Sequence, residues 1–197
     1  GILIWAKNAG GTGSDMGGAI SVDNNGNTYI TGRFEGTAFF DMLFLTSMGM
    51  WDIFVARLDT AGNIQWAKQI GDYSNLGFST ACNSICTDVN ENVYLTGCFD
   101  GTLDFDPDTG TYYLTPVSFW EDIFLCKLNS SGNFVWAKQT GGIAWDGGNA
   151  AIADGAGNLF ITGYFWDVVD FDPGPGIYNF SAGCEDIFIQ KMDTGGN

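Results

Sequence analysis

Short segments in which apolar and polar residues alternate recur along the chain, and turns rich in Asn, Asp and Gly separate them. Segments of this kind, enriched in Ile, Val, Tyr, Phe and Trp, are typical of β-strands. In the first third of the sequence they predict strands at residues 19–23, 28–34, 53–58 and 64–69. Almost no stretch shows the helical period of about 3.6 residues. The pattern therefore predicts an all-β protein.

Three sequence strings recur in the same order, which indicates an internal repeat. The first is Trp-Ala-Lys, the second is Asp-Ile-Phe, and the third is a Thr-Gly pair that follows two aromatic or aliphatic residues. Successive copies lie 61 to 70 residues apart. The copies begin at Trp5, Trp66 and Trp136, at Asp52, Asp122 and Asp186, and at Thr28, Val93 and Leu159.

The turns between strands share an Asp or Asn at the start and a Gly three residues later, which is typical of a bulged hairpin. The register that we derive from these turns sets Ala56 opposite Trp66 and Leu58 opposite Ile64, and it sets Cys126 opposite Trp136 in the next repeat. Both faces of each sheet are then largely apolar, so each sheet must be covered on both sides. Four-stranded antiparallel sheets in tandem with two buried faces indicate β-propeller blades, although a solenoid also buries both faces of its repeats.

The repeated strings resemble the SBBP β-propeller repeat family of secreted and surface proteins, found in Bacteroidetes and other bacteria. The resemblance is carried by four motifs, Trp136-Ala-Lys-Gln-Thr-Gly-Gly, Gly157-Asn-Leu-Phe-Ile-Thr-Gly, Asp170-Phe-Asp-Pro-Gly-Pro-Gly and Asp122-Ile-Phe-Leu-Cys-Lys-Leu-Asn. It implies a propeller blade and an extracellular or cell-surface location, and it implies no particular ligand.

The repeat predicts three four-stranded blades, at residues 17–70, 81–140 and 148–197, with residues 1–7 as the outermost strand of a preceding or closing blade. The third blade lacks its own outermost strand. Three blades do not close a ring, since propellers have about 4–8. Either a second copy completes a six-bladed homodimer, or further blades of a longer chain complete the ring. The absence of an initial Met and the break within a blade favour the longer chain.

Charge and composition exclude several functions. The net charge is −16, from 7 Lys and Arg against 23 Asp and Glu, and such a balance repels nucleic acid and anionic membranes. The chain contains no His, which excludes Ser-His-Asp and Cys-His catalysis. No apolar run approaches the ~20 residues of a membrane-spanning helix, so we expect no membrane insertion.

A possible Ca²⁺ site lies in the long connections between the second and third strands of a blade. Alternating carboxylates in a Gly- and Pro-rich loop suit a hard cation such as Ca²⁺. The alternative is that these carboxylates accept hydrogen bonds from backbone amides. The candidate ligands are Asp104, Asp106 and Asp108 in the second repeat and Asp170 and Asp172 in the third.

For the other residues that could take part in catalysis or binding, we favour a structural role in most cases. Asp52, Asp122 and Asp186 recur in every repeat, so we interpret them as structural carboxylates at the start of a strand. The hairpin register places Cys82 opposite Cys98, and we favour two free thiols over a disulfide. The Trp of each Trp-Ala-Lys string is expected between blades. The four other tryptophans are expected to be exposed and available for contacts; they are Trp51, Trp120, Trp145 and Trp166.

We predict no catalytic residue and no cofactor, so the leading hypothesis is a non-enzymatic extracellular module for protein–protein interaction, adhesion or surface-assembly scaffolding. Its partners would be itself, other surface proteins or glycans. The alternative is a propeller that binds carbohydrate or another ligand, with or without Ca²⁺. Segments present in one repeat only, at residues 74–80, 116–120 and 145–148, are the places where such a site would lie.

Overall fold

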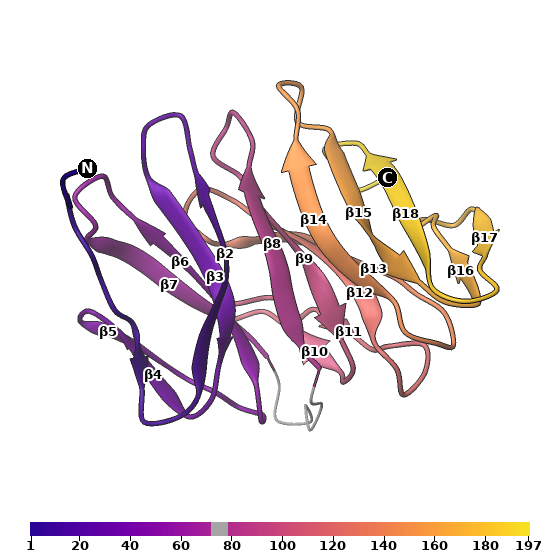
Figure 1. Cartoon of the computed structure of the whole chain (residues 1–197), viewed down its shortest axis with the longest axis horizontal. Helices are drawn as coiled ribbons and strands as arrows, with labels where there is room; N and C mark the ends of the chain where they lie inside the picture. Colours follow the sequence, from indigo (N-terminus) through magenta and orange to yellow (C-terminus); the bar gives the residue numbers. More distant parts are fainter. Residues whose placement is uncertain (72–78) are drawn as a thin grey trace.

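The computed structural model describes residues 1–71 and 79–197, which form β-strands and turns and no helix. Three main antiparallel sheets stand next to one another along the longest axis of the molecule (Figure 1). The predicted all-β class is therefore confirmed. None of the described residues forms a helix that is long and apolar enough to cross a membrane.

Each main sheet is built from consecutive hairpins, so its strands follow in chain order. The first sheet contains β2 (Asp15–Val22), β3 (Thr28–Phe34), β6 (Asp52–Leu58) and β7 (Ile64–Ile70). The second contains β8 (Ala81–Thr87), β9 (Val93–Phe99), β12 (Asp122–Leu128) and β13 (Phe134–Thr140). The third contains β14 (Gly147–Ala153), β15 (Leu159–Phe165) and β18 (Asp186–Met192).

Each connection between the second and third strands of a main sheet folds back as a small hairpin. These hairpins are β4 (Thr37–Phe40) with β5 (Leu43–Thr46), β10 (Leu103–Asp104) with β11 (Tyr113–Leu114), and β16 (Val168–Asp170) with β17 (Asn179–Ser181), while β1 (Gly10–Gly11) pairs with β4. One Phe from each hairpin packs on a Phe of the third strand. The ring centroids are 5.1 Å apart for Phe40 and Phe54, 5.1 Å for Phe105 and Phe124, and 5.0 Å for Phe171 and Phe188.

The other face of each sheet packs against the next sheet, as two-sided apolar patterning requires. Tyr29, Ile53 and Val55 of the first sheet belong to one buried cluster with Ile85 and Leu95 of the second. The second sheet contacts the third in the same way through a separate cluster. Two interfaces of one kind therefore hold the three sheets together.

The recurring Thr-Gly pair has a structural role at the centre of each sheet. Thr31, Thr96 and Thr162 donate from Oγ1 to the carbonyl oxygens of Phe54, Phe124 and Phe188, at 2.8, 2.8 and 2.7 Å. A Cβ on the Gly that follows would lie 1.9–2.0 Å from a backbone oxygen of the neighbouring strand and about 2.9 Å from the Phe ring. Only Gly fits there.

The predicted register is correct near the turns and wrong beyond them. Leu58 lies opposite Ile64 as predicted, but Trp66 lies opposite Arg57, and Ala56 lies opposite Ala67. A one-residue bulge between Arg57 and Leu58 shifts the pairing, and a bulge moves every later side chain to the other face. Trp66 therefore faces the second sheet.

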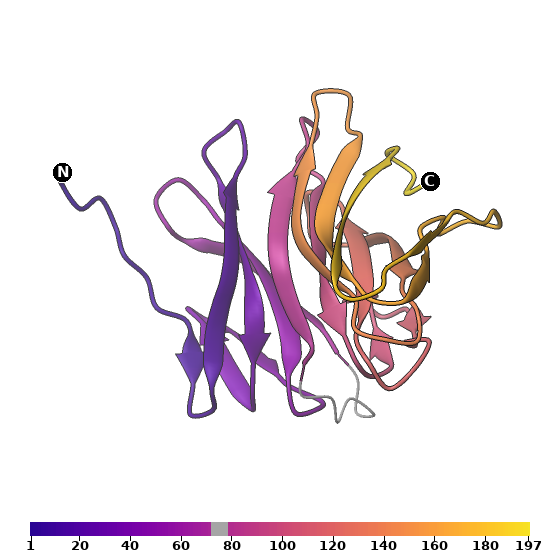
Figure 2. The same ribbon diagram turned by 45° about the vertical axis from the view of Figure 1, so that its right-hand side comes forward.

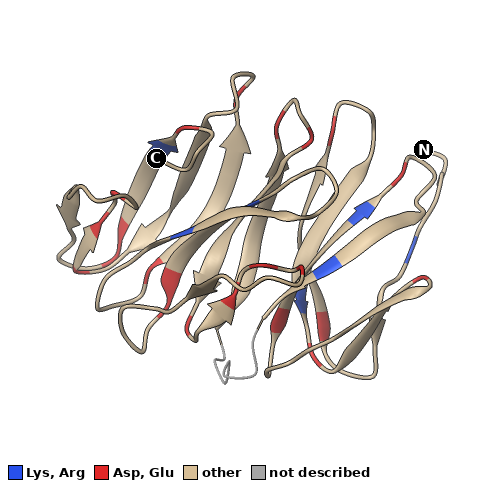
Figure 3. Cartoon of the chain, turned by 180° about the vertical axis from the view of Figure 1, so that it is seen from behind, with Lys and Arg blue, Asp and Glu red and all other residues tan. Residues whose placement is uncertain are grey.

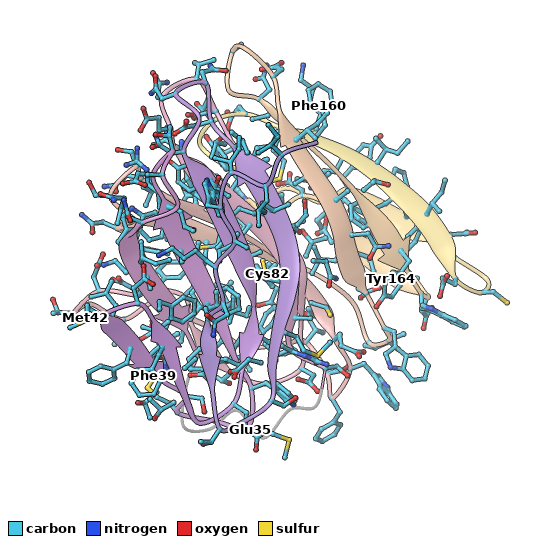
Figure 4. The ribbon with its side chains drawn as sticks, turned by 60° about the vertical axis from the view of Figure 1, so that its left-hand side comes forward. Glu35, Phe39, Met42, Cys82, Phe160 and Tyr164 are labelled. Atoms are coloured by element: carbon cyan, nitrogen blue, oxygen red, sulfur yellow. The ribbon has the colours of Figure 1, made fainter. Side chains whose placement is uncertain are left out.

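The same error affects the cysteines. In the second sheet Cys126 lies opposite Ala137 instead of Trp136. A bulge between Cys82 and Ser84 places Ala81, not Cys82, opposite Cys98. Cys82 lies between the first and second sheets (Figure 4), and both thiols are free. Burial raises the pKa of Cys82 and of Cys98 to about 12, so both stay protonated.

The strand predicted at residues 1–7 does not form. Residues 1–9 run outside the sheets (Figure 2), and Ile2, Leu3 and Ile4 are largely exposed. The physical reason is that their expected partner is a third strand of a preceding sheet, which the described residues do not supply. By contrast, the strand predicted at 28–34 matches β3.

Candidate binding surface

Three indoles from different loops gather beside the junction of the second and third sheets. Trp120 precedes β12, Trp145 precedes β14, and Trp166 follows β15. The ring centroids of Trp120 and Trp145 lie 4.2 Å apart, and those of Trp145 and Trp166 lie 5.9 Å apart. Trp120 and Trp145 are 45% and 40% exposed. We call these three residues the tryptophan cluster.

The loops that carry the tryptophan cluster also contain other apolar residues. Phe119, next to Trp120, is 96% exposed, and Val117 and Ile143 are 60% and 65% exposed. Several exposed apolar side chains on neighbouring loops mark an interaction site more often than scattered single residues do. The exposure predicted for Trp120 and Trp145 is thus confirmed.

Hydrogen bonds hold the three loops in fixed positions. Ser118 Oγ donates to the carbonyl oxygen of Ile143 at 3.3 Å, and the amide of Asp146 donates to the carbonyl oxygen of Glu121 at 2.9 Å. The carboxylate of Asp146 then accepts from the amide of Gly142 at 2.7 Å and from the amide of Trp166 at 3.1 Å. Asp146 therefore links the loop of Trp145 to the loop of Trp166.

The carboxylates behind the cluster are buried. Asp122 and Asp146 are both 0% exposed. Burial raises the pKa of Asp146 to about 6, with smaller contributions from the charges of Asp122 and Glu121. Burial also raises the pKa of Asp122 to about 6, against the hydrogen bonds from Val117 and Gln139. One carboxylate oxygen each of Glu121 and Asp122 is buried with no hydrogen-bond partner.

The cluster breaks the repeat symmetry. Ser14 and Ser79 occupy the positions that correspond to Trp145, while Glu35 and Asp100 correspond to Trp166. The nearest counterpart in the first sheet is a single indole, Trp51, with the guanidinium of Arg33 at 4.5 Å from its ring centroid. A binding site on a repeat scaffold is expected to depart from the repeat in this way.

The sequence pointed to these tryptophans and missed Asp146. The sequence indicates that the segment at residues 145–148 is specific to one repeat, but the strand pairing gives it counterparts at residues 14–17 and 79–82. Thr80 stands at the position of Asp146 in the second repeat, so that repeat gives no sign of a structural carboxylate there. A comparison with Asp15 in the first repeat, which accepts from the amide of Gly11 at 2.7 Å, would have identified it.

The carboxylates proposed for Ca²⁺ act in this structure as caps of backbone amides. Asp104 Oδ1 accepts from the amides of Asp106 and Tyr112 at 3.0 and 2.7 Å, and Asp106 Oδ1 accepts from the amide of Asp108 at 3.0 Å. Asp108 binds Lys68 at 2.6 Å and the amide of Phe134 at 3.1 Å.

The third repeat uses the same arrangement. Asp170 Oδ1 accepts from the amides of Asp172 and Tyr178 at 3.0 and 2.8 Å, and Asp172 Oδ1 accepts from the amide of Gly174 at 2.7 Å. Across the described residues, no three Cys, Asp or Glu side chains come together as a metal site. The Ca²⁺ site stays a prediction without support from the geometry.

The carboxylates that recur at the start of the third strand hold loops, as predicted for a structural Asp. Asp52 accepts from the amides of Met48 and Gly49 and from Gln69 Nε2, and Asp122 accepts from the amide of Val117 and from Gln139 Nε2. Asp186, whose sheet has no fourth strand within the described ranges, is exposed. Of the segment at 74–80, residues 74–78 lie outside the described residues.

No family model matches the sequence. Over 159 residues, 73% of this chain, the sequence is 26% identical to an uncharacterized WD repeat-containing protein, L264, of Acanthamoeba polyphaga mimivirus. Over 66 residues, 31% of this chain, it is 36% identical to a probable arabinan endo-1,5-α-L-arabinosidase A of Aspergillus terreus. The chain spans 11% and 19% of the lengths of these two proteins. WD repeats form propeller blades, so the first similarity hints at a β-propeller.

Proposed function

We propose that the chain is a β-propeller interaction module whose three main sheets are blades, and that it binds a partner protein through the tryptophan cluster and Phe119. The observation that carries the proposal is the cluster itself. Two of its three indoles are exposed, it is held by hydrogen bonds between three loops, and it is absent from the corresponding positions of the other repeats.

The chemistry of the cluster suits a protein partner. Tyr, Trp and Phe are enriched in the central contacts of protein interfaces, because a rigid aromatic side chain buries a large area with little loss of conformational entropy. The net charge of −16 favours a neutral or basic partner and disfavours acidic ones. We place the module outside the cell, as an adhesion or assembly scaffold of the SBBP type, on the strength of the repeat motifs.

A capture experiment with two variants of the surface tests the proposal. Phe119→Ser and Trp145→Ala remove apolar contact area, and Phe119 is 96% exposed, so its replacement leaves the fold intact. Met42→Ser is the matched control, because Met42 is 94% exposed and lies on the hairpin of the first sheet (Figure 4). The immobilised proteins are incubated with a detergent extract of the source cell surface.

The expected result is a partner retained by the wild type and by Met42→Ser and lost by at least tenfold with Phe119→Ser. The same partner, once purified, must bind the wild type directly in a titration. Equal retention by all four proteins would overturn the proposed surface.

A second candidate function is carbohydrate binding, favoured by the exposed indoles of Trp120 and Trp145. Aromatic rings stack on the apolar faces of sugars. The similarity to the arabinosidase makes soluble arabinan the first probe. Quenching of the Trp fluorescence by arabinan in the wild type, but not in Trp145→Ala, would support this function over protein binding.

A further inference from the structure

The first sheet shows which group an indole in the loop before its third strand can bind. Trp51, which directly precedes β6, lies next to Arg33 of β3. The guanidinium carbon of Arg33 is 4.5 Å from the ring centroid of Trp51. A guanidinium stacks on an indole because it is planar, delocalised and weakly hydrated. The chain thus contains one example of an arginine on an exposed loop tryptophan.

At the junction of the second and third sheets, the same two positions hold other residues. The strand pairing places Cys98 at the position of Arg33. Glu121, which directly precedes β12 and follows Trp120, stands at the position of Trp51. The second sheet therefore has a thiol in place of the cation and a carboxylate in place of the indole, next to the tryptophan cluster.

The carboxylate of Glu121 has no cation partner within the part of the chain that the structure describes. Its Oε2 is buried and accepts no hydrogen bond there, although the residue as a whole is half-buried. Burial raises the pKa of Tyr164 to about 12 and that of Asp146 to about 6, with smaller contributions from charges that include that of Glu121. A cation brought to Glu121 would compensate this negative charge.

The chain supplies no stacked cation to the tryptophan cluster from its described residues. The Lys and Arg side chains that lie over a ring do so on Trp51, Tyr29, Tyr94 and Phe160. Trp120 and Trp145 nevertheless keep open ring surface, as their exposed fractions show. A cation on this surface therefore has to come from another molecule.

The packing of the three indoles favours a flat cation over an enclosed one. Trp120 and Trp145 have ring centroids 4.2 Å apart at an interplanar angle of 47°, and Trp145 and Trp166 have centroids 5.9 Å apart at 69°. Rings this close contact each other directly and leave no space between them for an ammonium group. A quaternary ammonium is bound by rings that surround it, whereas a guanidinium needs only one open ring face.

We propose that the tryptophan cluster binds an arginine side chain of the partner protein, with the guanidinium stacked on Trp120 and its N–H groups donating to the carboxylate of Glu121. This inference rests on the proposed function, because it names the chemistry of the partner at the same surface. A guanidinium carries five N–H donors in one plane, so it stacks on a ring and donates to a carboxylate beside that ring at the same time. The net charge of −16 attracts a partner segment of this kind.

The first test compares two peptides of equal charge and length. The probes are the acetylated and amidated peptides Gly-Arg-Gly-Arg-Gly and Gly-Lys-Gly-Lys-Gly, titrated into the whole chain in about 0.15 M salt, which screens attraction to distant charges. The Arg peptide is expected to bind at least tenfold more tightly, since the lysine ammonium is compact and strongly hydrated. Equal affinities, or no binding of the Arg peptide, would overturn the proposal.

Variants of the two proposed contacts locate the site. Trp120→Leu is expected to weaken the Arg peptide at least tenfold and Trp120→Tyr, which keeps a ring, less than threefold. Glu121→Gln is expected to weaken it about fivefold. Glu35→Gln is the matched control, because it removes one charge from an exposed carboxylate of the first sheet (Figure 4). Circular dichroism checks that each variant is folded. If Glu35→Gln weakened the Arg peptide as much as Glu121→Gln, the binding would reflect only the net charge.

The captured partner separates this inference from the proposed function. Free arginine amide is expected to elute the partner from the immobilised chain, and lysine amide at the same concentration is not. A partner that is lost with Phe119→Ser but resists arginine amide and is retained by Glu121→Gln would overturn the arginine contact and leave the binding surface in place. An Arg peptide that binds as expected, with no protein retained from the extract, would support the arginine site and contradict the protein-binding surface.

Discussion

Aspartates at the two ends of the sheets have pKa values that are shifted in opposite directions. At the end with the hairpin turns, which we call the turn end, carboxylates such as Asp59 lie at the surface and accept hydrogen bonds from backbone amides. The amide of Asn63 is the largest contribution that lowers the pKa of Asp59. At the opposite end, which we call the loop end, burial raises the pKa of Asp122 and of Asp146 to about 6. Acidic residues occur at both ends (Figure 3).

The difference shows how one residue type serves two purposes. At the turn end the ionised carboxylate organises a turn that the backbone already favours, and Gly62, at a φ of 82°, completes it. At the loop end the buried carboxylate accepts hydrogen bonds from backbone amides of loops. These amides have no partner strand in a β-sheet. The first arrangement favours the charged form, and the second disfavours it.

The largest expected effect is from removal of the carboxylate that links the loops. Asp146→Ala leaves the amides of Gly142 and Trp166 buried without an acceptor, so we expect a loss of about 3 kcal/mol in the free energy of unfolding. Urea unfolding monitored by circular dichroism measures this loss. The counterpart at the turn end, Asp59→Ala, leaves amides that water reaches.

If Asp59→Ala lowered the stability as much as Asp146→Ala, the distinction between the two ends would be wrong. The indole emission of Asp146→Ala gives an independent readout, because the loops of Trp145 and Trp166 lose their link. A red shift of the emission is expected in this variant and not in Asp59→Ala.

Much of this arrangement follows from the sequence. The turn end was predictable because an Asp or Asn followed by Gly has one dominant local solution, and the Asp side chain accepts hydrogen bonds from the amides of its own turn. The order of the strands was predictable for the same reason, since the hairpins are local. The repeated Asp52 and Asp122 were correctly interpreted as structural from their repetition alone.

The loop end was less predictable because its contacts join residues far apart in the chain. Asp146 reaches Trp166 across a complete hairpin, and no spacing rule encodes that contact. Bulges were missed for a related reason: Gly18 in the first sheet and Asn83 in the second sit at irregular pairings that alternation of apolar residues does not record. One bulge was enough to place Trp66 on the wrong face.

A second comparison of the two ends uses glycines. A Cβ at Gly141 would lie 2.2 Å from Cγ of the buried Asp122, which cannot move without breaking its hydrogen bonds. We expect Gly141→Ala to lower the free energy of unfolding by about 2–3 kcal/mol. Gly132 at the turn end has a φ of 78° and faces the ring of Trp66, so Gly132→Ala is expected to lose about 1–2 kcal/mol.

Thermal unfolding at pH 5 ranks the two glycine variants. The double variant Gly141→Ala with Asp122→Ala separates the steric effect, because the smaller side chain makes room for the new Cβ. If Gly141→Ala were as damaging in that background as in the wild type, the clash with Asp122 would not be its cause.

The dependence of stability on pH sharpens the comparison further. Asp122 and Asp146 have folded pKa values of about 6, above the ordinary 3.8, so their contribution is complete below pH 3.8 and is lost as the pH rises through 6. The turn carboxylates with lowered pKa values contribute above pH 3.8 and lose that contribution as the pH falls. Stability should therefore be highest near pH 4, fall by about 2 kcal/mol or more between pH 4 and 6.5, and change little above pH 7.

Asp122→Asn checks the assignment, since its amide oxygen still accepts from Val117 and Gln139 and no charge is buried. In this variant we expect a smaller decline of stability between pH 4 and 6.5 and an unchanged fall below pH 3.8. Differential scanning calorimetry at half-unit intervals of pH measures both arms. An unchanged profile between pH 4 and 6.5 would show that Asp122 does not titrate there.

The smallest expected effect is a gain of stability at the turn end. The turn that starts at Asn129 uses an amide where the turns at Asp59 and Asp154 use a carboxylate, and Asn129 Oδ1 accepts only from the amides of Ser131 and Asn133. In Asn129→Asp the second oxygen can accept from Asn133 Nδ2, as Asp59 Oδ2 accepts from Asn63 Nδ2 at 3.0 Å. We expect a gain of about 0.5 kcal/mol at pH 7 that disappears below pH 3.5. Because the new charge adds to a net charge of −16, salt should enlarge the gain by screening the repulsion. A loss of stability at pH 7 in high salt would mean that the carboxylate does not stabilise this turn, and the contrast between the two ends would then be one of burial alone.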